Sequence, residues 1–175
     1  MLQALEKLKA GAWDLQPEPI QLKAILDQAT DSIEPQLHPG VQVVRQYTAD
    51  CWVDVDHLLL LGVLTNLLLN AVRFTTVGTV TLECDCCMAQ SDNSITARIA
   101  VCDTGCGMDT ELKESVFNKY VTQGGIGIGL YLSHQQVSAL GGELTVESPR
   151  LDGIQGSGFY FKLPLGARCC TREHG

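Results

Sequence analysis

The chain has 175 residues, of which 45% are hydrophobic and 18% are charged, a balance typical of one folded domain rather than of a disordered segment. Its formal net charge of −8 argues against a general affinity for nucleic acids or for acidic membranes. A bound phosphate group must therefore be held by local backbone dipoles, a metal ion and a few side chains.

The N-terminal segment carries charges throughout and does not resemble a secretory signal. Leucines at helical spacing predict that residues 1–12 are the end of a longer helix that precedes the domain. Pro17 and Pro19 then favour an extended segment. We expect one domain over residues 13–166, a tail at residues 167–175, and a cytoplasmic location.

Two further elements follow in chain order. Apolar residues at helical spacing from Leu22 to Ile33 predict a helix that ends near Pro35. The alternation of apolar and polar residues from Val41 to Tyr47 predicts a strand.

The most apolar stretch, from Leu58 to Val72, predicts a buried helix that ends at about residue 73. Asp54 or Asp56 is placed to cap its first turn. The stretch contains two asparagines and is shorter than the roughly 20 residues of a membrane span. We therefore expect no membrane insertion of this chain.

The second half of the chain predicts strands and short helices. Alternating residues from Thr79 to Cys86 and from Ile95 to Val101 predict a hairpin, with its turn at residues 90–93. The remaining predicted elements are a short helix from about Thr110 to Asn118, a helix that ends at Gly141–Gly142, and two strands, from Glu143 to Ser148 and from Phe159 to Leu163.

Eight cysteines are many for this length. Cys84, Cys86 and Cys87 form a close group, but no second pair follows at a spacing typical of zinc sites. Reduced, partly buried thiols are the simplest interpretation. A metal or redox role stays open as the alternative.

Asn66 and Asn70 lie four residues apart and so share one face of the predicted helix. One interpretation is a pair of core amides whose hydrogen bonds are satisfied within the fold. The other is a binding site in which an amide oxygen ligates Mg²⁺, a cation that takes oxygen ligands. Arg73, one turn later, is placed to reach a phosphate.

Asp103, Gly105 and Gly107 follow directly after an apolar strand. A carboxylate there can accept a hydrogen bond from the exocyclic amine of adenine, and glycines let the chain turn and approach a ligand closely. An ordinary Asp-Gly turn at the end of a strand is the alternative.

Gly125, Gly127 and Gly129 open a helix that begins near Leu130. Their backbone N–H groups and the helix N-terminus favour an anion. The spacing is neither the dinucleotide-binding fingerprint nor a Walker A loop. A flexible hinge is the alternative for this run taken alone.

The order of these three signals resembles the GHKL ATPase superfamily, and most closely the catalytic ATP-binding domain of sensor histidine kinases. Residues Asn66–Thr75 resemble the family's N box, and Asp103–Met108 its first glycine box. Val116–Tyr120 resembles the F box, and Gly125–Leu130 the second glycine box. The resemblance covers almost the whole chain.

The resemblance implies an α/β (α+β) two-layer sandwich, in which helices cover one face of a mixed sheet, and it implies a site for ATP and Mg²⁺. Asn70 is then the metal ligand, and Asn66 supports the metal or a phosphate; these two are the catalytic pair. The remaining nucleotide-binding residues that it implies are Arg73, Phe74, Asp103, Gly105, Gly107, Gly125, Gly127, Gly129 and Leu130.

The implied function is transfer of the γ-phosphoryl group of ATP to a histidine in two-component signalling. Hydrolytic members of the superfamily carry a glutamate where this chain has Asn66, which disfavours an ATPase. No histidine here lies in a motif that resembles a phosphoacceptor helix, and His134 is expected at the surface. The expected partners are a histidine-bearing dimerisation domain and a response regulator, with no nucleic acid. The alternative is a non-catalytic nucleotide-binding or pseudokinase module that acts by docking.

Overall fold

The structure, a computed structural model, describes residues 13–47, 51–88, 95–121 and 128–165. The described elements in chain order are β1 (Glu18–Gln21), α2 (Leu22–Ile33), the short 3-10 helix η1 (Glu34–Gln36), β2 (Val41–Tyr47), β3 (Trp52–Val55), α3 (His57–Phe74), β4 (Gly78–Met88), β5 (Ile95–Asp103), α4 (Thr110–Ser115), α5 (Gly129–Ala139), β6 (Glu143–Glu147) and β7 (Gly158–Leu165).

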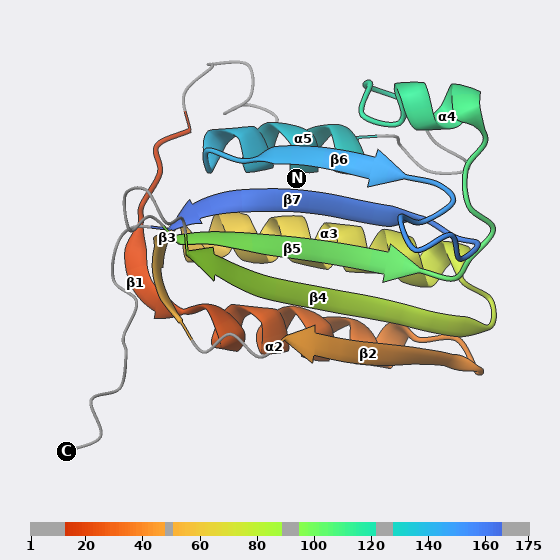
Figure 1. The fold of residues 1–175 in the computed structure, drawn as a ribbon, viewed down its shortest axis with the longest axis horizontal. Coiled ribbons are helices and arrows are strands. Elements are labelled where there is room, and N and C mark those ends of the chain that lie inside the picture. The colour runs from red at the N-terminus through yellow and green to blue at the C-terminus, as the bar shows by residue number, and fades with distance from the viewer. Residues whose placement is uncertain (1–12, 48–50, 89–94, 122–127, 166–175) are drawn as a thin grey trace.

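One layer of the fold is a five-stranded sheet in the order β2-β4-β5-β7-β6. Strands β2 and β4 run parallel, whereas the other neighbouring pairs in this sheet are antiparallel. Helices α2, α3 and α5 cover one face of the sheet (Figure 1). The predicted two-layer sandwich with a mixed sheet and helices on one face is therefore confirmed.

The hairpin of β4 and β5 forms the centre of the sheet and follows the predicted alternation. Val80 pairs with Asp103 at one end of the hairpin, and Cys86 pairs with Ala97 towards the other end. Alternate side chains of both strands, including Leu82 and Ile99, are buried beneath the helices. The turn predicted at residues 90–93 lies outside the described residues.

Helix α3 runs between α2 and α5 and contacts both. Asp56 is its N-cap: Oδ1 accepts a hydrogen bond from the backbone N–H of Leu59 at 2.9 Å. Helix α3 has 18 residues and a mean hydropathy of 1.5, so by length and composition alone it could also span a membrane. Seven of its apolar side chains are buried within the domain, which is the pattern of a core helix.

A second, two-stranded sheet of β1 and β3 was not predicted from the sequence. Its strands have four residues each, and Pro19 lies within β1, opposite Asp54. A proline has no N–H to donate to a neighbouring strand, so it is tolerated in an edge strand. Its presence nevertheless argues against a strand when only the sequence is considered. The backbone N–H of Leu22, at the start of α2, donates to the carbonyl of Cys51 at 2.9 Å, which joins this small sheet to the helical layer.

Helix α4 is shorter than predicted, since it ends at Ser115 rather than Asn118. Asp109 caps its start by accepting a hydrogen bond from the backbone N–H of Leu112 at 2.8 Å. Past its end the chain turns, and Tyr120 adopts a positive φ of 65°. A helix of this length has little stability of its own, so tertiary contacts decide where it stops.

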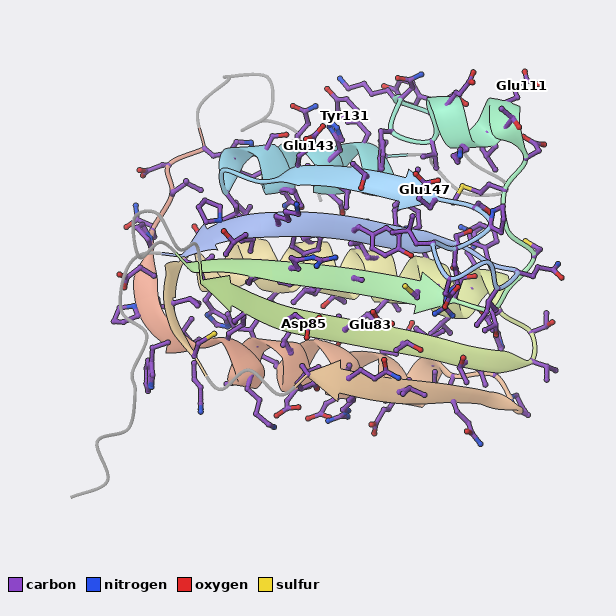
Figure 2. The ribbon with its side chains drawn as sticks, viewed as in Figure 1. Glu83, Asp85, Glu111, Tyr131, Glu143 and Glu147 are labelled. Carbon is purple, nitrogen blue, oxygen red and sulfur yellow. The ribbon has the colours of Figure 1, made fainter. Side chains whose placement is uncertain are left out.

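The sheet face opposite the helices carries several charged side chains. Figure 2 shows Glu83 and Asp85 on β4 and Glu143 and Glu147 on β6, four acidic side chains over this face. The Asn-bearing helix α3 lies behind the sheet in the same view.

Candidate functional site

Three segments that are far apart in the sequence meet on the helical side of the sheet. They are the second half of α3, the turn that follows β5, and the first turn of α5. Contacts between α3 and α5 and between α3 and β5 bring them together. Each segment carries residues of one of the three motifs that predict a nucleotide site.

Asp103 ends β5 and is buried, with 4% of its surface exposed. Its Oδ1 accepts hydrogen bonds from the backbone N–H groups of Gly105, at 2.8 Å, and of Ser157, at 3.2 Å. Among the residues that the structure describes, none donates a hydrogen bond to Oδ2. Burial raises the pKa of this carboxyl above its ordinary value, against the lowering effect of the two backbone donors.

The two glycines after Asp103 are held where a side chain does not fit. A Cβ on Gly105 would overlap the backbone carbonyl of Phe74, at the end of α3. Gly107 has a φ of +74°, and a Cβ there would lie 2.9 Å from Oγ of Ser148. The turn therefore depends on both glycines, one for close approach and one for its backbone conformation.

The loop between β6 and β7 supports this turn from the side. Ser148 Oγ accepts a hydrogen bond from the backbone N–H of Met108 at 2.7 Å and donates to the carbonyl of Gly156 at 2.9 Å. Ser157, the next residue, supplies one of the two donors to Asp103. Ser148 and Ser157 could not be predicted as site residues, because nothing in their local sequence indicates that the two loops meet.

Asn66 connects α3 to the start of α5. Its Nδ2 donates a hydrogen bond to Oγ of Ser133 at 2.8 Å, and a Cβ added to Gly129 would lie 2.6 Å from its Oδ1. Ser133 is buried and lies one helical turn after Gly129. That spacing is the signal by which the sequence could have indicated Ser133. The interpretation of Asn66 as a core amide satisfied within the fold accounts for its amino group.

Asn70 lies one turn further along α3 and is partly buried. Within the described parts of the chain, no group forms a hydrogen bond with its side-chain amide. Its oxygen is therefore available to a ligand, and an amide oxygen is a suitable donor for a hard cation.

The end of α3 presents a cation beside an aromatic ring. The exposed guanidinium of Arg73 lies 5.5 Å from the centre of the Phe74 ring. The carbonyl of Phe74 accepts a hydrogen bond from the backbone N–H of Cys106 at 3.4 Å. Both candidate residues are thus next to the turn that follows Asp103.

The segment that resembles the F box packs against α5. The ring of Phe117 lies 5.0 Å from that of His134 and 6.2 Å from that of Phe159. His134 was expected at the surface, but it is half-buried by this stacking. Lys119 adds a second contact, since its Nζ lies 5.0 Å from the ring centre of Tyr131, which Figure 2 shows on α5.

The second glycine run is described only at its end. Gly129 and Leu130 begin α5, and Leu130 packs against the hydrophobic core. Gly125 and Gly127 lie outside the described residues, so their expected contact with a triphosphate stays a prediction.

Nothing in the described part of the chain resembles a cluster of metal-binding side chains. No group of three or more His, Cys, Asp or Glu residues lies together there with the geometry to hold a metal ion. A divalent cation at Asn70 would therefore need ligands from water and from a bound substrate, as Mg²⁺ commonly takes.

Comparison with known proteins agrees with this arrangement. Residues 55–167 match the family model described as histidine kinase-, DNA gyrase B-, and HSP90-like ATPase. The sensor histidine kinase AruS of Pseudomonas aeruginosa is 38% identical over 141 residues, which cover 76% of this chain and 12% of AruS. The hybrid signal transduction protein dokA of Dictyostelium discoideum is 30% identical, with coverages of 91% and 10%. The chain thus spans a small part of the relatives that it matches.

Solved structures show the same fold. The crystal structure of full-length ShkA in complex with AMPPNP superposes with a TM-score of 0.82 at 26% identity, over 96% of this chain and 35% of that one. A mycobacterial sensor histidine kinase, MprB, superposes with a TM-score of 0.71 at 23% identity, over 86% of this chain and 98% of that one. The chain therefore belongs to the histidine kinase-, DNA gyrase B- and HSP90-like ATPases, and it carries the catalytic ATP-binding domain of the sensor histidine kinases.

Proposed function

We propose that this domain binds Mg-ATP between α3, the turn after β5 and the start of α5, and transfers the γ-phosphoryl group to a histidine outside this chain. The observation that carries the proposal is Asp103, a buried carboxylate with one oxygen fixed by two backbone donors and the other without a donor among the described residues. Such an oxygen suits the exocyclic amine of adenine, because a guanine would present a carbonyl at the same position.

The nucleotide would lie along the second half of α3. Gly105 permits close approach to the backbone of Phe74, because a Cβ on Gly105 would overlap the Phe74 carbonyl. Arg73, whose guanidinium is exposed, would contact a phosphate or the ribose with its planar fork. The start of α5 offers backbone N–H groups to the phosphates, and Gly125, Gly127 and Gly129 would allow the chain to pass close to them.

Asn70 would hold the Mg²⁺, and Asn66 would support the ion from the preceding turn of α3. Bound Mg-ATP supplies the phosphoryl group and a cation that neutralises its charge. Asn66 cannot act as a general base, because an amide does not accept a proton near neutral pH; it positions instead, through Ser133 and the close approach to Gly129. This chemistry suits transfer to a nucleophilic histidine better than activation of water.

The acceptor would come from another segment. Two described histidines are engaged elsewhere: His57 lies 3.5 Å from a carboxylate oxygen of Glu18, and His134 stacks on Phe117. We infer that a histidine-bearing dimerisation domain presents the acceptor and that a response regulator receives the phosphoryl group afterwards. The matched relatives include proteins named as sensor kinases, which supports a cytoplasmic location for the domain.

The experiment that tests this proposal mixes the purified chain with ATP labelled at the γ-phosphate, Mg²⁺ and a purified histidine-bearing dimerisation domain. We expect acid-labile, base-stable label on the acceptor, and its loss on addition of EDTA. Asn70→Ala should lower the transfer rate by about 100-fold or more, since metal ions contribute several kcal/mol to such transition states.

The matched control is Gln42→Ala, which removes an exposed side-chain amide on β2, the edge strand of the five-stranded sheet. It should leave transfer unchanged. Tight binding of Mg-ATP by the wild type without transfer to any dimerisation domain would contradict the kinase proposal and favour a docking module.

A further inference from the structure

Three cysteine thiols gather beside β4 at the end of the sheet that is remote from the candidate nucleotide site. Cys51 precedes β3, and Cys84 and Cys86 lie within β4. The sulfur atoms of Cys51 and Cys86 are 2.9 Å apart. A disulfide bond has a length of about 2.05 Å, so these atoms would have to approach by less than about 1 Å to form one.

This thiol pair is independent of the nucleotide site. Cys86 pairs with Ala97, whereas Val80, six residues earlier on β4, pairs with Asp103. Six residues of strand span roughly 20 Å. A change at the thiols therefore does not alter the contacts of Asp103 directly.

We propose that Cys51 and Cys86 are the two halves of a reversible disulfide that forms when the protein meets a peroxide. In the absence of an oxidant both remain thiols, as is usual for proteins of the cytosol, where disulfides are mostly transient and responsive to redox conditions. The alternative that these cysteines bind a metal ion has no support in the described residues, since no cluster of side chains there is suited to a metal.

The exposed fractions of the two residues indicate which thiol reacts first with the peroxide. Cys86 is partly exposed, whereas Cys51 is buried, with 5% of its surface accessible. The thiolate of Cys86 attacks one peroxide oxygen, the O–O bond breaks, and the leaving hydroxide takes a proton to become water. The sulfur of Cys51 then attacks the Cys86 sulfenic sulfur, the S–O bond breaks, and a second water leaves as the S–S bond forms. Two thiols and hydrogen peroxide thus give one disulfide and two waters.

Cys84 lies in β4 two residues before Cys86 but does not compete as a nucleophile. It is fully buried, and burial raises the pKa of its thiol to about 12. The thiolate is the reactive form of cysteine, so a thiol that stays protonated reacts slowly with peroxide. The thiol with access to solvent is instead Cys86, which points towards Cys51.

The bond would fasten the small sheet to the large one. Cys51 already accepts a hydrogen bond from the backbone N–H of Leu22 through its carbonyl, and a link to Cys86 would add a covalent tie to β4. Closing a loop of this length restricts the unfolded chain, so we expect Tm to rise by about 5–10 °C on oxidation.

The test uses the full chain, reduced, freed of reductant and treated with hydrogen peroxide. Mass spectrometry under denaturing conditions should show the loss of two hydrogen atoms. Digestion with trypsin should link the peptide of residues 46–73 to that of residues 74–98, and fragmentation should place the bond at Cys86. A thiol reductant should restore the original mass and the original Tm.

Cys51→Ser and Cys86→Ser should each abolish the link and the rise in Tm, whereas Cys106→Ser, at an exposed thiol, should retain both. The wild-type peptide map decides the question even if a serine variant folds poorly. A bond to Cys84 or Cys87, or oxidation to sulfinic acid without any link, would overturn the proposal. Mg-ATP affinity should change by less than twofold on oxidation, so this test stands apart from that of the kinase proposal.

Discussion

At the scale of single residues, the candidate site depends on a few atoms whose positions leave little freedom. Asp103 receives two backbone donors on Oδ1, and Gly129 approaches Asn66 so closely that a Cβ would lie 2.6 Å from the amide oxygen. A substitution at such a position disturbs a particular contact, so each has a specific expected consequence.

Asp103→Asn is expected to weaken Mg-ATP binding by about 10–100-fold, because the free Oδ2 acceptor becomes an amino group facing the adenine amine. The oxygen can still accept from Gly105 and Ser157, so the fold should persist. Calorimetry with ATP and GTP measures the effect, and the preference for ATP over GTP should shrink or reverse. Equal affinity of wild type and variant for ATP would show that Asp103 does not contact the base.

The same carboxylate predicts a pH dependence of binding. Burial raises the pKa of Asp103, so on acidification it takes up a proton earlier than an exposed aspartate would, and an acceptor is lost. The affinity for ATP should therefore fall as the pH decreases, and Asp103→Asn should remove that part of the dependence.

Gly129→Ala is expected to weaken Mg-ATP binding by about tenfold or more, because the new methyl group must displace Asn66 from its contact with Ser133. The matched control is Gly62→Ala, in the middle of α3, where an added Cβ meets nothing within 4 Å. That change should leave binding intact and stabilise the protein by about 1 kcal/mol, since alanine is the better helix former. Titration calorimetry and thermal melts separate the two effects.

At the scale of elements, α3 has the largest role, because it supplies both asparagines and much of the core. Its start is fixed by Asp56, whose Oδ1 caps the helix while Oδ2 accepts a hydrogen bond from the backbone N–H of Gln16 at 3.1 Å. The cap thus also holds the segment that leads into the domain.

Asp56→Ala is expected to lower the free energy of unfolding by about 1 kcal/mol, the usual cost of a lost cap, and Tm by about 2–4 °C. Asp54→Ala is the matched control, since Asp54 lies in β3 and does not cap the helix. Chemical denaturation of both variants measures the difference. Equal destabilisation by the two would argue against the cap as the cause.

At the scale of the whole molecule, buried tyrosine and cysteine side chains with raised pKa values, Cys102 among them, make the fold sensitive to alkali. Burial raises the pKa of Tyr47 and of Tyr160 from 10.0 to about 12, and that of Cys84 from 9.0 to about 12. Between about pH 9 and about pH 12 the unfolded chain loses these protons while the folded chain keeps them. The free energy of unfolding must therefore fall as the pH rises through that window.

Urea denaturation at a series of pH values checks this expectation. The double variant with Tyr47→Phe and Tyr160→Phe should show a shallower decline above pH 10, because these two groups no longer titrate. An unchanged slope would mean that other groups cause the alkaline loss of stability.

Much of this architecture could be predicted from the sequence because its signals are local. The alternation in β4 and β5, the apolar run of α3 and the order of the Asn, Asp and glycine motifs each depend on residues close together in the chain. They determined the fold class and the family, which the comparisons confirmed. The N-cap of α3 was predicted as Asp54 or Asp56 for the same reason, and the structure shows that it is Asp56.

Which distant groups meet is visible only in the folded chain, because such contacts arise from packing and leave no local pattern. The β1–β3 sheet, the donation of Ser157 to Asp103 and the hydrogen bond from Asn66 to Ser133 join segments 30 or more residues apart. The same applies to Cys51 and Cys86: the sequence contains eight cysteines and does not indicate that these two lie together. Local patterns of residues thus indicate what kind of domain this is, whereas packing of the folded chain sets which atoms of its candidate sites lie within reach of one another.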